Sequence, residues 1–177
     1  MKSIEEIAQK IRMVVFDFDG VFTDNRVLLL ENGKEAVFCS RSDGFGLSAL
    51  HSLGIELLVI STEVNPVVGV RCNKLQLQYI QGCDDKAAVL KKEASLRGIS
   101  LLETAYMGND INDLGCLSIV GLPVCVNDAY PEVLNAAKYI TAKPGGFGAV
   151  REFCDYLVKV KKDYALCGRN VDSCEAI

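Results

Sequence analysis

The amino-acid sequence predicts an α/β fold in which a doubly wound parallel sheet is covered by helices. Short apolar runs alternate along the chain with amphipathic stretches of helical length. The first run, residues 13–17, is apolar up to its final aspartate, as in a strand that is buried on both faces. Polar clusters follow several of these runs, and doubly wound sheets bind ligands beyond the carboxyl ends of their strands.

The other elements follow the first strand in order. Residues 26–40 contain two strand-like runs on either side of Asn32-Gly33, a dipeptide typical of β-hairpin turns. Pro66 begins a later helix, where its missing N–H costs nothing. The remaining expected elements are a helix over 43–53 closed by Gly54, a strand over 55–60, a helix over 84–97 closed by Gly98, strands over 105–107 and 124–126, and a helix over 149–160.

Length and composition fit one compact domain. Of the 177 residues, 50% are hydrophobic and 24% are charged, so a large core can form. We expect a single domain over 1–164 and a C-terminal tail over 165–177. The net charge of −4 and the scattered basic residues argue against a nucleic-acid partner. The sequence shows neither a signal peptide nor a membrane-spanning run, so we expect a cytoplasmic protein that binds no membrane.

The eight cysteines do not predict a zinc site. They form no C-x-x-C pair, and His51 is the single histidine, whereas zinc sites need closely spaced ligand pairs. Buried free thiols are the simplest interpretation. Cys167 and Cys174 lie in the polar tail, and we assign them no role.

The first polar cluster, FDFDGVFTD, joins two carboxylates to a glycine. Gly20 predicts a turn that lets Asp17 and Asp19 face one crevice. Asp17 is then a candidate nucleophile toward phosphorus, and Asp19 a candidate acid/base that protonates the leaving oxygen and later activates water. A solvated turn is the competing interpretation. A calcium-binding loop is excluded because the twelfth position from Asp17 is Leu28 rather than a glutamate.

Two further motifs supply groups that bind phosphoryl oxygens. Ser61 ends the second core strand in VISTE and offers a hydroxyl, while Thr62 offers a backbone N–H. A helix cap is the alternative for this Ser-Thr pair. Lys86, in GCDDKAAVL, stands at a helix start, where a cation is unfavourable unless an anion is near. A phosphate and an aspartate would supply that anion, and a surface lysine is the alternative.

The fourth motif, YMGNDINDL, is rich in oxygen ligands. Asn109, Asp110, Asn112 and Asp113 place four amide or carboxylate side chains within five residues. Hard oxygen ligands without thiolate or imidazole indicate Mg²⁺, which would offset the repulsion between a phosphate and a nucleophilic carboxylate. Asp110 is also a candidate helix N-cap. Acid pair, hydroxyl, lysine and acidic loop together are the parts of a phosphoryl-transfer site.

With these motifs the chain resembles the haloacid dehalogenase superfamily of phosphatases over about residues 11–160. DFDGVFTDNRV, RSDGFG, QGCDDK, GNDINDL and GGFGAVRE are similar to its small sugar-acid phosphatases, which hydrolyse 3-deoxy-octulosonate 8-phosphate or nonulosonate 9-phosphates. The C-terminal module of animal acylneuraminate cytidylyltransferases is similar too. The resemblance implies a Rossmann-like sheet with a β-hairpin flap after the first strand and no large cap domain.

The resemblance also implies roles for individual residues. Asp17 is the nucleophile, Asp19 is the acid/base, and Ser61 and Lys86 hold the phosphoryl group. Mg²⁺ is bound by Asp17, the Asp19 carbonyl and the GNDIND loop. The octulosonate enzymes carry two aspartates after the glycine of this loop, whereas this chain has an amide first. Both Asn109 and Asp110 therefore stay candidates for the direct metal ligand.

A second departure concerns the substrate. Ser61-Thr62-Glu63, followed by Arg71 and Lys74, is similar to the nonulosonate phosphatases rather than to the octulosonate enzymes. Arg71 suits a bidentate grip on a carboxylate, although a solvated helix face is the alternative. We expect a nine-carbon, sialic-acid-type 9-phosphate, with the eight-carbon 8-phosphate as the alternative. The substrate-contacting candidates are Thr23, Ser40, Arg41, Asp43, Gly44, Thr62, Glu63, Arg71 and Lys74.

The resemblance further implies a homotetramer in which the hairpins pack centrally and a neighbouring subunit covers each site. The apolar residues 27–30 are consistent with such an interface, and residues 144–148 would form a mobile loop near the site. A non-catalytic oligomerisation module is the main competing interpretation, and the presence of Asp19 argues against it. A phosphoacceptor signalling domain would carry its acidic pair before the phosphorylated aspartate. A phosphotransferase that uses an acceptor other than water stays open.

Overall fold

A six-stranded parallel sheet forms the centre of the computed structural model, which describes residues 3–171 and their side chains up to residue 164. The strand order is β5-β4-β1-β6-β7-β8, and every pair in it is parallel. The strands are β1 (Met13–Phe16), β4 (Glu56–Ile60), β5 (Gln78–Ile80), β6 (Thr104–Gly108), β7 (Leu122–Cys125) and β8 (Tyr139–Ile140). The predicted doubly wound sheet is confirmed.

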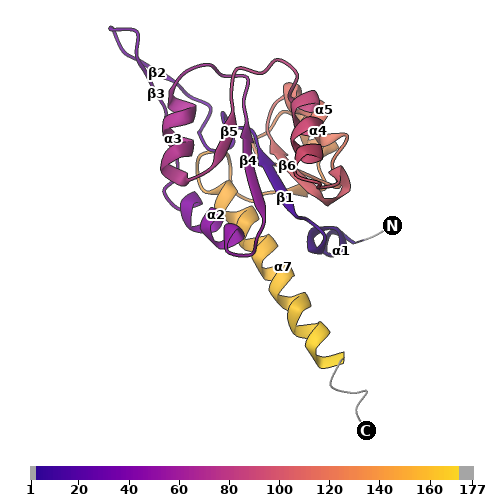
Figure 1. Cartoon of the computed structure of the whole chain (residues 1–177). Helices are drawn as coiled ribbons and strands as arrows, with labels where there is room; N and C mark the ends of the chain where they lie inside the picture. The colour runs from indigo at the N-terminus through magenta and orange to yellow at the C-terminus, as the bar shows by residue number, and fades with distance from the viewer. Residues whose placement is uncertain (1–2, 172–177) are drawn as a thin grey trace.

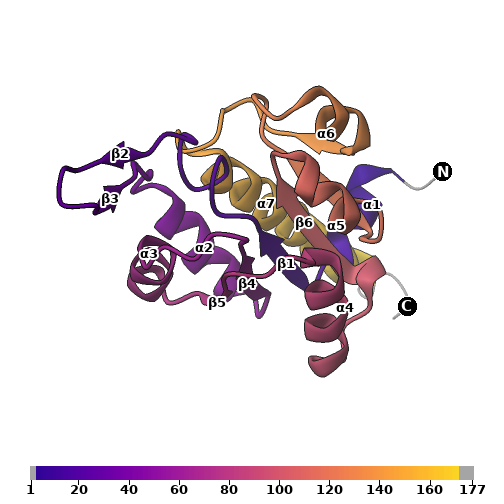
Figure 2. The same ribbon diagram turned by 90° about the horizontal axis from the view of Figure 1, so that it is seen from above.

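Helices cover both faces of this sheet (Figures 1 and 2). On one face α2 packs against α7, and on the other α4, α5 and α6 pack in sequence. The helices are α1 (Ile4–Gln9), α2 (Asp43–His51), α3 (Val67–Leu75), α4 (Lys86–Leu96), α5 (Leu114–Leu117), α6 (Pro131–Ala136) and α7 (Ala149–Val171), with 3₁₀ turns η1 (Leu101–Glu103) and η2 (Ile111–Asp113). Within the described range, none of them has the length and apolar character needed to cross a bilayer.

The central strand β1 is the point at which the direction of strand addition reverses. Phe16 lies opposite Val59 of β4 on one side and opposite Met107 of β6 on the other. The chain first builds outward through β4 and β5 and then crosses back to β6. Connections that diverge in this way leave a crevice beyond the carboxyl end of the central strand. Asp17 is the first residue after β1, so the topology itself places it there.

The turn after β1 rests on a buried apolar core. All four residues of β1 are fully buried, because their side chains are covered on both faces of the sheet. Behind the turn, the rings of Phe18 and Phe22 stack with centroids 5.8 Å apart, and Phe16 meets Phe22 edge-on at 5.5 Å. Close packing of this kind fixes the position of the residues that it supports.

A hairpin projects from the body between β1 and α2 (Figures 1 and 2). Its strands, β2 (Leu28–Leu29) and β3 (Glu35–Ala36), pair antiparallel around the predicted Asn32-Gly33 turn, in which Gly33 has a φ of +77°. No large cap domain intervenes in this part of the described chain. Apolar side chains of the hairpin are exposed rather than packed.

Several elements differ from the expectation. The helix expected over 149–160 continues to Val171 and extends beyond the body (Figure 1), so residues 165–171 of the expected tail are helical. No proline interrupts it, and an established helix propagates more easily than it starts. The expected tail over 172–177 lies outside the described residues. The strands β5 and β8 and the helix α6 were not anticipated, because they are too short to show a period.

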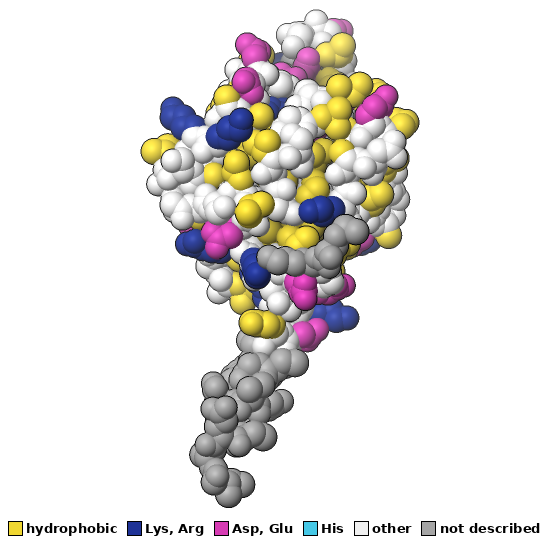
Figure 3. Space-filling model, turned by 90° about the vertical axis from the view of Figure 1, so that its right-hand side faces the viewer, with side chains coloured by type: hydrophobic (Ala, Val, Ile, Leu, Met, Phe, Trp, Pro, Cys, Tyr) yellow, Lys and Arg dark blue, Asp and Glu magenta, His cyan; other side chains and the backbone are white. Residues whose placement is uncertain are grey.

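Polar surface and thiols follow simple patterns. On the face drawn in Figure 3, basic side chains are dispersed among acidic and apolar ones. The cysteines whose side chains are described are free thiols, as expected: Cys39, Cys72, Cys83, Cys116, Cys125 and Cys154. The side chains of Cys167 and Cys174 lie outside the described residues.

Candidate active site

The turn that carries Asp17 and Asp19 is fixed by two small residues. Gly20 has a φ of +75°, a conformation that L side chains disfavour, and a Cβ there would lie 2.0 Å from Nδ2 of Asn109. Oγ1 of Thr23 accepts the Gly20 N–H at 3.1 Å and donates to Asp19 Oδ1 at 3.4 Å. Thr23 was expected to contact substrate. Because it is fully buried, it instead braces the turn that holds Asp19.

A buried lysine joins two carboxylates at the floor of the crevice. Nζ of Lys86 lies 2.8 Å from Oδ1 of Asp17 and 2.8 Å from Oδ1 of Asp113, and the three side chains are at most 7% exposed. Lys86 is the first residue of α4, and Asp85 caps that helix by accepting the N–H of Ala88 at 2.9 Å. The structure therefore supplies the anions that a lysine at a helix start requires.

The protonation of these groups reflects their burial. Burial, and after it the charge of Asp113, raises the pKa of Asp17 to about 7, although Lys86 opposes this. Burial alone would lower the pKa of Lys86, but Asp17 and Asp113 keep it above its ordinary value. Burial and the charge of Glu63 raise the pKa of Asp19, which favours the protonated form that a general acid needs.

Asp113 anchors the loop after β6. Its Oδ1 accepts from Lys86 and from the Tyr106 hydroxyl at 2.7 Å, and its Oδ2 accepts the N–H groups of Asn109 at 2.9 Å and Asp110 at 3.2 Å. Four donors thus surround one buried carboxylate. The sequence grouped Asp113 with the oxygen-rich loop but did not single it out. Tyr106 looks like any other strand residue in the sequence, because no local pattern marks it.

Three oxygen atoms can converge beside this cluster. The Asn109 side-chain amide lies 2.8 Å from the Asp19 carbonyl oxygen and 3.3 Å from Oδ2 of Asp17. In one orientation of the amide, its NH₂ donates to both of these oxygen atoms. In the other orientation, the amide oxygen faces both of them, and a cation bound between the three oxygen atoms would stabilise this arrangement. Ligand oxygens at right angles around Mg²⁺ are about 3 Å apart, so this set fits that ion.

The same set explains why side-chain clusters alone do not reveal a metal site. It consists of one carboxylate, one main-chain carbonyl and one amide, and in the described part of the chain no three His, Cys, Asp or Glu side chains gather as possible ligands. Asp17 and Asp113 with one lysine leave the buried cluster with an excess negative charge, which a divalent cation would offset.

The two candidates for the direct metal ligand have different environments. Asn109 is buried and faces Asp17. Asp110 is the N-cap of η2, and its Oδ1 accepts the N–H of Ile111 at 2.6 Å. Asp110 therefore has the helix-cap role that the sequence leaves open, because its carboxylate accepts a main-chain N–H of the turn that it begins.

The loop after β4 brings Ser61 beside the end of β1. Ser61 is 2% exposed, and its Oγ accepts the N–H of Glu63 at 3.1 Å, which leaves its own O–H to donate. Thr62 is exposed next to it. The carboxylate of Glu63 accepts the N–H groups of Val64 and Asn65, both at 2.7 Å, so it shapes its own loop.

Two residues after the hairpin, Ser40 and Asp43, form hydrogen bonds with helices α3 and α7. On α3, Arg71 donates from Nη2 to the Ser40 carbonyl at 2.7 Å, whereas Arg41 is exposed. Asp43, expected to contact substrate, is only 1% exposed, and its Oδ1 accepts the N–H of Arg151 at 3.2 Å. Asp43 therefore joins the start of α2 to the start of α7. Burial raises the pKa of its carboxyl to about 6.

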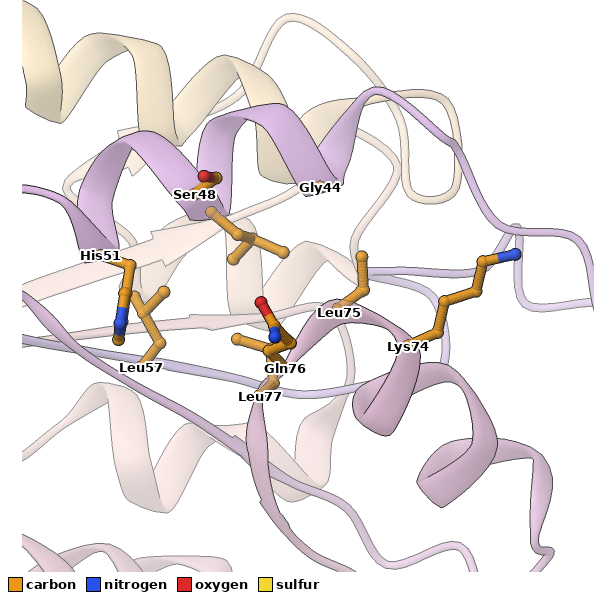
Figure 4. Close-up of a pocket in the computed structure, with 9 residues that line it drawn as sticks. Gly44, Ser48, His51, Leu57, Lys74, Leu75, Gln76 and Leu77 are labelled. Carbon is orange, nitrogen blue, oxygen red and sulfur yellow. The ribbon is translucent and has the colours of Figure 1, made fainter.

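Gly44 and Lys74 border a separate pocket between α2 and the end of α3 (Figure 4). The pocket has a volume of about 200 Å³. In Figure 4 the Lys74 ammonium points away from the other lining side chains. Among the described residues, Lys74 makes no hydrogen bond or ion pair with the Asp17 cluster. The structure does not bring these two predicted substrate contacts to the site.

The loop over 144–148 packs directly behind the Asp17 turn. Gly146 donates its N–H to the Val21 carbonyl at 3.1 Å, and Gly145 donates to Oδ1 of Asp128 at 2.9 Å. A Cβ on Gly145 would lie 1.9 Å from the Gly20 carbonyl oxygen. The loop expected to be mobile thus has a packed position in which only glycine fits.

Known proteins are similar to this chain in sequence and fold. A family model of haloacid dehalogenase-like hydrolases matches residues 73–153. The 3-deoxy-D-manno-octulosonate 8-phosphate phosphatase of Escherichia coli K12 is 34% identical over 152 residues, which cover 85% of this chain and 81% of that protein. The chain belongs to the haloacid dehalogenase-like hydrolases. As its relatives in this group are phosphatases, it is a phosphoric monoester hydrolase.

Solved structures of haloacid dehalogenase hydrolases have the same fold. A putative family member from Streptomyces avermitilis is 44% identical with a TM-score of 0.82, over 84% of this chain and 86% of that one. The octulosonate 8-phosphate phosphatase of Moraxella catarrhalis, solved with a magnesium ion, a phosphate ion and KDO, is 31% identical with a TM-score of 0.88, over 95% and 97%. Mg²⁺ is the cofactor of haloacid dehalogenase phosphatases, as expected.

Proposed function

We propose that this hydrolase removes phosphate from a 2-keto-3-deoxy sugar acid, with 3-deoxy-octulosonate 8-phosphate as the first candidate. The proposal is carried by the buried Asp17–Lys86 pair at the carboxyl end of the central strand. Several relatives are named for the eight-carbon ester, which favours it over the nine-carbon substrate expected from the sequence. That expectation rested on Glu63, Arg71 and Lys74. Glu63 and Arg71 form hydrogen bonds with main-chain groups, and Lys74 borders a separate pocket.

In the first chemical step, a carboxylate oxygen of Asp17 attacks phosphorus and forms an aspartyl-phosphate as the bond from phosphorus to the sugar oxygen breaks. The proton held by Asp19 passes to the leaving sugar oxygen. The Ser61 hydroxyl, the Thr62 N–H and the Lys86 ammonium bind the phosphoryl oxygens during transfer.

In the second step, Asp19 is a carboxylate and takes a proton from water. The water oxygen attacks phosphorus, the bond to Asp17 breaks, and inorganic phosphate leaves while Asp19 regains its proton. Asp17, the Asp19 carbonyl and Asn109 would hold Mg²⁺, which offsets the repulsion between the phosphate and the Asp17 carboxylate.

The buried cluster of Asp17, Lys86 and Asp113 argues against a non-catalytic oligomerisation module. Burying two carboxylates around one ammonium costs several kcal/mol per ion unless each is well paired. Lys86, Asp17 and Asp113 are all at most 7% exposed. Replacement of such a buried cluster by well-packed apolar residues is often neutral or stabilising, so stability alone gives no reason to keep these charges.

A phosphatase panel tests the proposal. With Mg²⁺ present, we expect phosphate release from 3-deoxy-octulosonate 8-phosphate at a higher kcat/KM than from a nine-carbon keto-acid 9-phosphate or from para-nitrophenyl phosphate. Asp17→Asn is the control and should reduce kcat by roughly a thousandfold or more while the protein stays folded. Preference for the nine-carbon ester would revise the substrate. Full activity of Asp17→Asn would end the covalent mechanism.

We also propose that the enzyme is a homotetramer in which a neighbouring subunit covers the hairpin. Val27, Leu28, Leu29 and Leu30 are between 44% and 69% exposed on a hairpin that leaves the body. Monomeric proteins rarely expose apolar side chains in such a contiguous group. Cover by a second chain would also narrow the open side of the crevice.

A further inference from the structure

One buried polar group of the site has no part in the mechanism above. Tyr106 lies in the middle of β6, opposite Val15 of β1, and is fully buried. Its hydroxyl donates to Oδ1 of Asp113 at 2.7 Å. A tyrosine in a sheet core needs such a partner, because an unpaired hydroxyl there is costly. Phenylalanine would fill the same space without that need.

The hydroxyl shares its acceptor with the catalytic lysine. Oδ1 of Asp113 receives Tyr106 at 2.7 Å and Lys86 at 2.8 Å, while Lys86 lies at an equal 2.8 Å from Asp17. The Lys86 ammonium therefore lies at the same distance from the carboxylates of Asp17 and Asp113. Asp113 has a second, neutral donor at this oxygen, and that donor stabilises its charge without adding a positive one.

Removal of the neutral donor would shift this balance. Lys86 would then be the sole donor to Oδ1 of Asp113, and a charge-assisted bond strengthens when its competitor is lost. The ammonium would move toward Asp113 and away from Asp17 and from the phosphoryl group that Asp17 receives. We infer that Tyr106 is a positioning residue that acts through Asp113 to hold Lys86 at Asp17. This inference rests on the phosphatase function proposed above.

Tyr106→Phe tests the inference because it removes only the hydroxyl. We expect kcat to fall about tenfold with KM nearly unchanged, the loss of one hydrogen bond to a charged group. Tyr156→Phe is the matched control. The Tyr156 hydroxyl is buried on α7 and has no hydrogen-bond partner among the described residues, so its removal should leave kcat unchanged. Equal kcat for Tyr106→Phe and the wild type would overturn the inference.

A double-mutant cycle separates positioning from a simple packing role. In an Asp113→Asn background the hydroxyl no longer faces a charge, so adding Tyr106→Phe should lower kcat less than about twofold. The same tenfold loss in both backgrounds would show that Tyr106 does not act through Asp113.

Crystal structures of the wild type and Tyr106→Phe give a readout that does not require turnover. The distance from Lys86 to Asp17 should lengthen in the variant, and an unchanged distance would contradict the inference. If the wild type hydrolyses no ester of the panel, the proposed function is wrong, whereas this structural comparison still decides the role of Tyr106.

Discussion

The floor and the rim of the crevice are built in opposite ways. At the floor, Asp17, Lys86 and Asp113 are buried and paired with one another inside a single chain. We call the hairpin residues 27–30, together with Phe38, Phe45 and Phe147, the rim. Its apolar side chains are exposed, by 70%, 71% and 62% for the three phenylalanines. The polar residues expected to bind the sugar, such as Glu63 and Arg71, are engaged with nearby main-chain groups.

This contrast separates chemistry from selectivity. The floor follows from topology, because the four parallel strands β5, β4, β1 and β6 end side by side, and the segments after β5, β1 and β6 carry Lys86, Asp17 and Asp113. All of its side chains come from one protein chain. The rim leaves apolar surface exposed, so we expect the choice of substrate to depend on what covers it. Changes at the floor should therefore alter catalysis or metal binding, whereas changes at the rim should alter assembly.

Asn109→Ala should have a large effect, because it removes a proposed Mg²⁺ ligand from the floor. Loss of the amide oxygen that faces Asp17 and the Asp19 carbonyl should weaken Mg²⁺ binding roughly 100-fold. Isothermal titration calorimetry measures this affinity directly. Asn109→Asp, which replaces a neutral ligand with a charged one, should bind Mg²⁺ more tightly than the wild type.

Asp110→Ala is the matched control for this prediction. It removes the N-cap of η2 and should cost about 1 kcal/mol of stability, with Mg²⁺ affinity changed only a few-fold. A larger loss of Mg²⁺ affinity in Asp110→Ala than in Asn109→Ala would reverse the assignment of the two neighbours.

Asp43→Asn tests whether the buried carboxyl of Asp43, which belongs to neither the floor nor the rim, lowers the stability of the protein when it ionises. Burial raises the pKa of Asp43 from 3.8 to about 6 in the folded protein, so the stability that this group contributes is present below pH 4 and is lost as the pH rises through 6. Near pH 4 the variant and the wild type should unfold at similar temperatures. Above pH 7 the variant should gain on the order of 3 kcal/mol relative to the wild type.

Thermal unfolding followed by circular dichroism between pH 4 and pH 8 measures this difference. The activity of the variant at pH 7 should stay close to that of the wild type if Asp43 has no contact with substrate. A stability difference that is independent of pH would mean that burial does not raise the pKa of the Asp43 carboxyl.

Leu29→Glu should have the smallest effect on the fold, because it acts at the rim. The side chain is 69% exposed, so a charge there should leave the unfolding temperature almost unchanged. The same charge in a subunit interface should dissociate the tetramer, as sedimentation velocity would show. Leu102→Glu, at a 73% exposed leucine of η1, is the control and should leave the assembly intact. A monomeric wild type would refute the proposed assembly.

The sequence predicts the floor better than the rim for physical reasons. Strand ends, the Asp17-x-Asp19 pair and the lysine at a helix start are local patterns, and parallel topology brings such patterns together. The burial of Asp43 depends on Arg151, which is 108 residues away, and no local pattern shows that α7 covers it. Tyr106 looks like any strand residue, since its function lies in a partner on the following loop.

The glycine loop behind the Asp17 turn links the two ends of the chain. Gly145 meets the Gly20 carbonyl main chain to main chain, although about 125 residues separate them. During synthesis Asp17 leaves the ribosome early, but the loop over 144–148, which supports the turn after Asp17, emerges only after β8. Chains that end before this loop would lack that support, so hydrolytic competence should arise late in folding and depend on a nearly complete polypeptide.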